Sequence, residues 1–62
     1  MVRDEWVLAV KYKLFKHYIT YKQLGEAVGT SEDVIKQLMV APNRYPNLKI
    51  KVSEYLNVHE NL

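Results

Sequence analysis

The stretch that most constrains this chain is TYKQLGEAVGTSEDVIKQL, residues 20–38. Thr20 followed three residues later by Gln23 is the pattern of a capping box, in which each side chain binds a backbone N–H at the start of a helix. Gly29 suits the left-handed conformation that ends many helices, and Ser31 is a favourable N-cap for the helix that follows. The stretch therefore predicts two short helices joined by a tight turn.

The two helices are predicted at residues 21–28 and 32–40. Their inward faces follow from the spacing of apolar and small residues by three and four. These residues are Leu24, Ala27 and Val28 in the first helix and Val34, Ile35 and Leu38 in the second. A turn this short makes the helices cross steeply, as in a helix-turn-helix, and leaves the outer face of the second helix free to enter a groove.

A further helix is predicted before this pair, from about residue 3 to residue 18. Its apolar stripe has members spaced by three or four residues, namely Val7, Val10, Leu14 and Tyr18, and it is widened by Trp6, Leu8, Tyr12 and Phe15. Ile19 directly precedes the Thr20 cap, so it can act as a hydrophobic staple against Leu24.

The C-terminal part allows two interpretations. Residues 42–47, PNRYPN, predict a loop, and Pro42 ends the preceding helix by about Ala41. Beyond it, the residues Leu48, Val52, Tyr55 and Leu56 fit a fourth helix over about 48–56 with Asn47 as its cap. Alternation of apolar residues with lysines instead fits a short β wing at 48–52. We expect an all-α fold, a small four-helix bundle containing the helix-turn-helix, with the winged form as the alternative.

Size and composition exclude several classes of function. With 62 residues and no cysteine, the chain predicts one domain over residues 1–62 without disulfides or a thiolate zinc site. His17 and His59 have no carboxylate at ligand spacing, so neither a metal nor another cofactor is expected. No nucleophile with a base at usable spacing and no phosphate-binding glycine loop is present, so neither an enzyme nor a small-molecule substrate is expected.

Charge and hydropathy restrict the partners further. Nine Lys and Arg against seven Asp and Glu give a formal charge of +2, too little by itself to indicate nucleic acid. The basic residues Lys11, Lys13, Lys16, His17 and Lys22 gather near the Thr20 cap, either as a basic patch or as the solvated face of a helix. No run approaches the ~18 apolar residues of a membrane span, and the first residues lack the apolar region of a secretory signal. A cytoplasmic protein without membrane contact is expected.

Several residues at matching positions resemble the phage-repressor and Cro type of helix-turn-helix domain. The matching residues are the pair Ile19-Thr20, the small residue Gly25 four positions before the turn, the turn Val28-Gly29, the cap Ser31, the buried positions Ile35 and Leu38, and the ending YLNV at 55–58. The resemblance covers about residues 7–58. Because fold does not determine function, these matches are more specific for the fold than for an activity.

The chain also departs from that family. Gly25 stands where the family usually has alanine, and Thr30 stands where it usually has a hydrophobic residue. The sequence MVAPNRYPN, residues 39–47, replaces the glutamate and glycine that often follow the second helix. This last departure keeps excisionase-like winged relatives as an alternative.

The resemblance implies that residues 32–40 form a recognition helix in the major groove of DNA. Its outward positions, which would contact bases, are Ser31, Glu32, Asp33, Lys36 and Gln37. Gln37 can bond adenine with both amide atoms, and Lys36 can donate to guanine or to phosphate. The expected phosphate contacts are Lys16, Lys22, Gln23 and Arg44.

Glu32 and Asp33 do not fit a simple DNA interface, because carboxylates approach a polyanion unfavourably. They can stabilise the first turn of their helix through its dipole, accept from the amino groups of cytosine and adenine, or face a protein. Two functions are therefore kept. The first is a sequence-specific transcriptional regulator of phage or mobile-element type, such as a repressor, that binds a double-stranded DNA operator as a homodimer in a bacterial cytoplasm. The second is an antirepressor or modulator that keeps the fold and binds a repressor protein.

Overall fold

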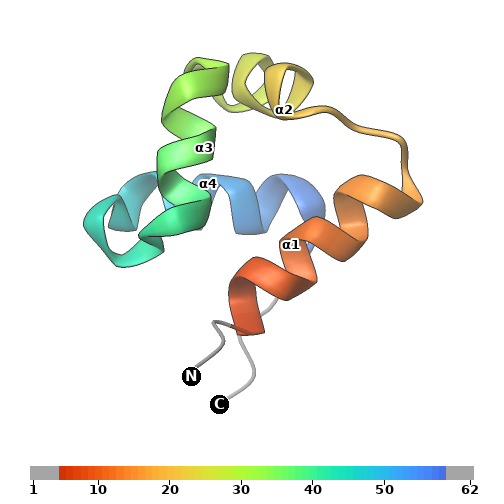
Figure 1. The fold of residues 1–62 in the computed structure, drawn as a ribbon, viewed down its shortest axis with the longest axis horizontal. Coiled ribbons are helices and arrows are strands. Elements are labelled where there is room, and N and C mark those ends of the chain that lie inside the picture. Colours follow the sequence, from red (N-terminus) through yellow and green to blue (C-terminus); the bar gives the residue numbers. More distant parts are fainter. Residues whose placement is uncertain (1–4, 59–62) are drawn as a thin grey trace.

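The chain folds into four α-helices and one short 3₁₀ turn in the computed structural model, which describes residues 5–58 (Figure 1). The elements in chain order are α1 (Glu5–Lys16), α2 (Tyr21–Val28), α3 (Glu32–Val40), the 3₁₀ turn η1 (Pro42–Arg44) and α4 (Pro46–Leu56). The predicted all-α class is confirmed. The alternative of a β wing is wrong, because residues 48–52 lie inside α4.

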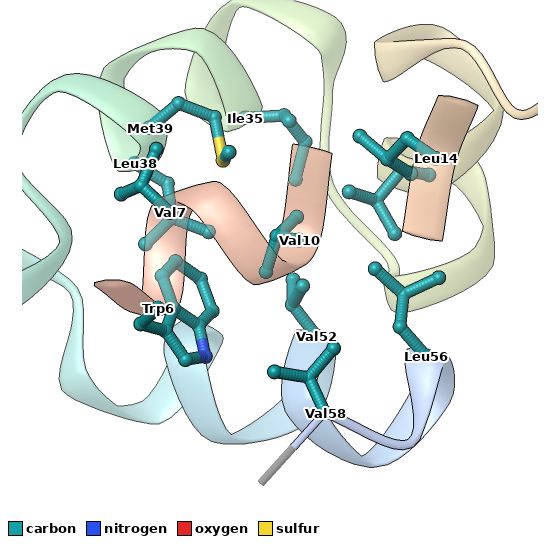
Figure 2. Packing of buried hydrophobic residues seen from close by; sticks show 11 residues of the cluster. Trp6, Val7, Val10, Leu14, Ile35, Leu38, Met39, Val52, Leu56 and Val58 are labelled. Carbon is teal, nitrogen blue, oxygen red and sulfur yellow. The ribbon is translucent and has the colours of Figure 1, made fainter. Parts of the chain in front are cut away.

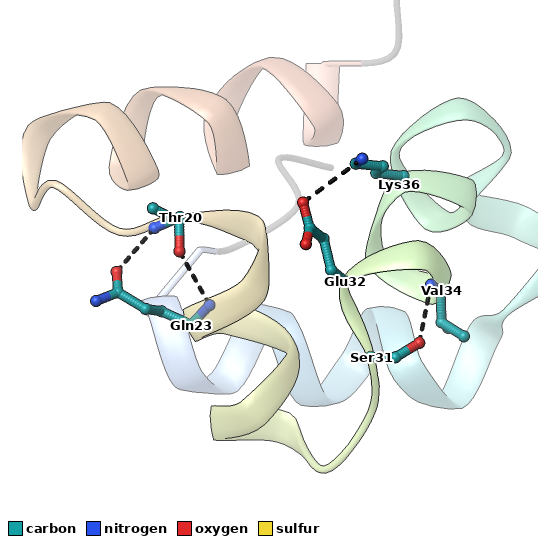
Figure 3. A network of polar contacts seen from close by, with 6 residues as sticks. All are labelled: Thr20, Gln23, Ser31, Glu32, Val34 and Lys36. Carbon is teal, nitrogen blue, oxygen red and sulfur yellow. Dashed lines mark hydrogen bonds and ion pairs between the residues drawn. The ribbon is translucent and has the colours of Figure 1, made fainter.

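The beginnings of α2 and α3 are capped as the sequence predicts (Figure 3). At α2, the Gln23 N–H donates to Thr20 Oγ1 at 3.1 Å, and the Thr20 N–H donates to Gln23 Oε1 at 2.9 Å. At α3, the Val34 N–H donates to Ser31 Oγ at 3.3 Å. These bonds satisfy N–H groups that have no partner within their own helix, and they explain why both predicted starts are right.

Three helices end in the same way, with one residue in the left-handed conformation. These residues are Tyr18 after α1 (φ 56°), Gly29 after α2 (φ 81°) and Asn57 after α4 (φ 57°). In each case the next N–H donates to the carbonyl five residues earlier: Ile19 to Leu14 at 2.9 Å, Thr30 to Gly25 at 2.7 Å and Val58 to Ser53 at 2.9 Å. This is the Schellman motif, which turns the chain sharply and satisfies carbonyls at the end of the helix.

The first helix is shorter than predicted, and its stripe is narrower. Its predicted start at residue 3 lies outside the described residues, and α1 ends at Lys16 rather than at Tyr18. Tyr18 is 90% exposed, so its predicted place in the core is wrong. The left-handed conformation costs an L residue about 1–2 kcal/mol, and it is held here because the turn lets Ile19 pack against the core. Of the residues that widen the stripe, Trp6 is buried, whereas Leu8, Tyr12 and Phe15 are exposed.

The path from α3 to α4 also differs from the prediction. Residues 42–47 are not an open loop, because η1 and the first residues of α4 occupy them and Pro42 is buried. The fourth helix begins at Pro46, with Tyr45 rather than Asn47 at the N-cap. A proline suits this first position because its φ is already helical and it lacks an N–H that would need a partner. Tyr55 was predicted on the inner face of this helix, but it is exposed.

The core is a single apolar cluster to which all four α-helices contribute (Figure 2). Its members are Trp6, Val7, Val10, Leu14, Leu24, Ile35, Leu38, Met39, Val52, Leu56 and Val58. Two predicted inner residues fit less well, since Val34 is only half-buried and Ala27 is exposed. The Trp6 indole N–H donates to Ser53 Oγ at 2.7 Å, which joins α1 to α4. Among residues 5–58, no helix is long and apolar enough to cross a bilayer.

Candidate functional site

The outward face of α3 is a polar surface that the fold leaves open. Ile35, Leu38 and Met39 are buried on its inner side. The residues predicted to contact bases, Ser31, Glu32, Asp33, Lys36 and Gln37, are all exposed. The helix is therefore divided into one side that packs in the core and one side that is available for a partner.

Part of this face is engaged in contacts within α3 (Figure 3). Ser31 Oγ accepts the capping bond from Val34, so one acceptor site of this hydroxyl holds the helix start. Lys36 Nζ lies 3.5 Å from Glu32 Oε2, one turn earlier, and both side chains are about half exposed. Exposed pairs at this spacing contribute about 0.3–0.5 kcal/mol, so Lys36 can exchange the carboxylate for another anion at small cost.

Gln37 is held by a residue that follows the helix. The Tyr45 hydroxyl donates to Gln37 Oε1 at 2.6 Å, and Tyr45 is itself half-buried against the core. This bond orients the amide so that its carbonyl faces Tyr45. The two N–H donors of the amide and the second lone pair of its oxygen stay available to another molecule.

A hollow of about 340 Å³ opens beside the C-terminal half of α3. Its lining residues are Lys36, Gln37, Val40, Ala41, Arg44 and Tyr45. Two cationic side chains and an oriented amide thus surround an apolar floor, which suits an anionic group next to an apolar surface. Glu32 and Asp33 lie in the first turn of α3, where Glu32 pairs with Lys36, and Arg44 adds a second cation to the hollow from η1.

The predicted phosphate contacts are not all brought together. Of the four, Arg44 lines the hollow beside Lys36 and Gln37. Lys22 and Gln23 are exposed in the first turn of α2, where Gln23 Oε1 is taken up by the capping box. Lys16 lies at the end of α1, with its ammonium 5.9 Å from the centre of the Tyr12 ring. These three residues lie on other elements and do not line the hollow.

The hydrogen bond between Tyr45 and Gln37 was not predicted from the sequence. Tyr45 stands at the tip of a proline-bracketed segment, eight residues after Gln37, and nothing in a helical or strand period links the two positions. The only available signal was an aromatic residue between Pro42 and Pro46, since a proline-restricted segment has few ways to leave the end of α3. Their contact depends on the turn that η1 makes.

Comparisons of the chain with models of protein families, with curated proteins and with solved structures found no match. The resemblance to the phage-repressor family accordingly stays a prediction from the residues that carry it.

Proposed function

We propose that this chain is a helix-turn-helix protein that binds double-stranded DNA in a sequence-specific way, with α3 in the major groove. The observation that carries the proposal is the position of Lys36 and Gln37 on the exposed side of α3, next to Arg44 and opposite the buried side. A helix held by its inner face and polar on its outer face is the element that fits the width of the major groove. Transcriptional regulation at a phage or mobile-element operator is the role that follows.

In this proposal some exposed side chains contact bases and others contact phosphates. The Gln37 amide, oriented by Tyr45, presents donors and one remaining acceptor site to a base edge, which suits adenine. Lys36 leaves Glu32 and donates to guanine or to phosphate. Arg44, Lys22 and Lys16 contact the phosphate backbone, where their contribution depends on charge and not on sequence. Ser31, Glu32 and Asp33 lie at the helix start, nearest to the bases.

A second candidate function is binding to a repressor protein, as an antirepressor or modulator does. The observation that favours it is the pair of exposed carboxylates, Glu32 and Asp33, in the first turn of α3. They would approach phosphates unfavourably, and they would suit a cationic protein surface. The excisionase-like alternative has lost its basis in a wing, because residues 48–52 are helical.

Duplex titration at two salt concentrations tests the first function. A sequence selected from a random duplex pool should bind tightly at about 50 mM salt and lose orders of magnitude in affinity by about 200 mM, because binding releases counterions from several phosphates. We expect Lys36→Ala and Gln37→Ala to weaken specific binding by ~1–3 kcal/mol while circular dichroism shows an unchanged fold. Lys51→Ala serves as the matched control, since this lysine is exposed on α4.

The two variants should also differ in the salt dependence of binding and in base-pair preference. Lys36→Ala should reduce the salt slope by about one if Lys36 contacts a phosphate, whereas Gln37→Ala should relax the preference for one base pair and leave the slope unchanged. Absence of binding to any duplex at low salt would rule out the first function and leave the repressor-binding candidate. Unchanged affinity in both variants would show that another face of the molecule meets DNA.

Removal of the Glu32 charge gives a result of opposite sign. Glu32→Gln frees Lys36 and removes an anion from the helix tip, so we expect DNA affinity to rise by about 0.5–1 kcal/mol, the scale of a screened charge interaction at a few ångströms. The same change should lower the free energy of unfolding by ~0.3–1 kcal/mol, because the carboxylate stabilises the helix start. Affinity and stability are measured on the same sample by titration and urea unfolding. A loss of affinity would indicate that Glu32 itself contacts a base.

A further inference from the structure

The outer side of α1 carries an apolar stripe that no other part of residues 5–58 covers. Leu8, Tyr12 and Phe15 are spaced by four and three residues, so they lie along one side of the helix. They are 45%, 60% and 81% exposed. The buried residues of the same helix, Trp6, Val7, Val10 and Leu14, face the core on the other side. A helix that covers one core needs one apolar side, and α1 has two.

The charges beside this stripe are arranged for an antiparallel neighbour of the same kind. Glu5 lies in the first turn of α1 and Lys16 in the last. They are about three turns apart and therefore lie on the same flank of the helix. The Lys16 ammonium is 5.9 Å from the centre of the Tyr12 ring, which places it at the edge of the stripe.

When two such helices pack antiparallel about a twofold axis, the flank that carries Glu5 and Lys16 on one copy meets the same flank on the other copy. The start of each helix then lies beside the end of the other. Glu5 of each copy then lies near Lys16 of the other copy, and the helix dipoles oppose each other favourably. In a parallel pair the two Lys16 residues would lie at the same level on opposite flanks, and neither would meet a Glu5. We propose that two copies of this chain associate through the α1 stripe as an antiparallel, twofold-symmetric pair.

The apolar area of the α1 stripe is enough for such a pair and limits the affinity of the dimer. Aromatic side chains offer about 150–250 Å² each, so the stripe with the apolar stems of its flanking lysines supplies roughly 500 Å² per copy. Two copies together bury about 1,000 Å², which is at the lower limit for a specific protein contact. The dimer is therefore reversible and depends on protein concentration. The twofold axis passes near Tyr12, which places Leu8 of one copy against Phe15 of the other.

Sedimentation equilibrium of the full chain, without DNA, tests this association. The protein should change from monomer to dimer as its concentration rises, and Phe15→Ser should raise the dissociation constant at least tenfold. Tyr55→Ser is the matched control, because Tyr55 is an aromatic residue about half exposed on α4. This control should dimerise like the unchanged protein. Circular dichroism should show the same helix content in all three.

Charge exchange tests the antiparallel orientation. Glu5→Lys and Lys16→Glu should each weaken the dimer several-fold, and the double variant should restore it because both cross-pairs form again with opposite signs. Since the sequence has no cysteine, Leu8→Cys mixed with Phe15→Cys should oxidise to a heterodimer faster than either variant alone.

Three outcomes would overturn the pairing. If the protein stays monomeric up to millimolar concentration, the interface does not exist. If the protein does not dimerise but binds to anionic lipid vesicles, the stripe contacts a membrane surface instead. A double charge variant weaker than either single variant would contradict the antiparallel arrangement. The inference does not depend on the proposed function, because dimerisation is measured in the absence of DNA and can fail or succeed while duplex binding does the opposite.

Discussion

Replacement of Trp6 by alanine is expected to cause a large loss of stability and to bring the protein close to unfolding at room temperature. Trp6 is 3% exposed and is the only tryptophan of the chain. Truncation of a buried tryptophan costs about 3–5 kcal/mol through lost apolar burial and the cavity that remains. A domain of this length has a total free energy of unfolding of about 3–9 kcal/mol, so the loss removes between about a third and all of it.

A milder variant removes the polar contact of Trp6 together with only part of its ring. Trp6→Phe keeps an aromatic ring in the core and removes the indole N–H that donates to Ser53 Oγ, so a loss of about 1–2 kcal/mol is expected. Urea unfolding followed by far-ultraviolet circular dichroism measures both variants, since fluorescence is lost with the indole. If Trp6→Ala melts within a few degrees of the unchanged protein, the contact between α1 and α4 does not hold the fold together.

Replacement of Gly25 by alanine is expected to destabilise the protein by about 1–3 kcal/mol, the range for overpacking a filled site. At an ordinary helical position the same change stabilises by roughly 0.5–1 kcal/mol, because alanine loses less backbone freedom on folding. Here a Cβ would lie 2.9 Å from the carbonyl carbon of Ser31 and 3.0 Å from its oxygen. These are backbone atoms of the turn between α2 and α3, and they cannot rotate away.

The matched control for Gly25 is Ala27→Gly, two positions further along α2. Ala27 is exposed, so its replacement should cost about 0.5–1 kcal/mol through propensity alone. Thermal and urea unfolding should therefore show that adding a methyl at Gly25 is more harmful than removing one at Ala27. A Gly25→Ala variant that is more stable than the unchanged protein would mean that the turn between α2 and α3 leaves room for a methyl group at position 25. In that case the alanine usual in the phage-repressor family would fit here as well.

The candidate site was only partly predictable from sequence. Alternation of buried and outward positions along α3 identified Lys36 and Gln37 as exposed, because the helical period alone sorts residues between the two sides. Arg44 was predicted as a phosphate contact, but its location relative to α3 could not be predicted. Its place beside Lys36 follows from the path of η1. The orientation of Gln37 by Tyr45 could not be read from any period, since it joins two residues across a change of direction in the chain.

For the fold, the sequence alone determined what depends on neighbours along the chain. The bounds of α2 and α3, the Thr20 and Ser31 caps and the left-handed Gly29 were all predicted, because hydrogen bonds across three to five residues decide them. Tertiary structure decided the rest. It ends α1 at Lys16 so that Ile19 can pack on the core, turns Tyr55 outward, and requires glycine at position 25, where a helical pattern would accept alanine. In each case the deciding contact is with a part of the chain that the local pattern does not include.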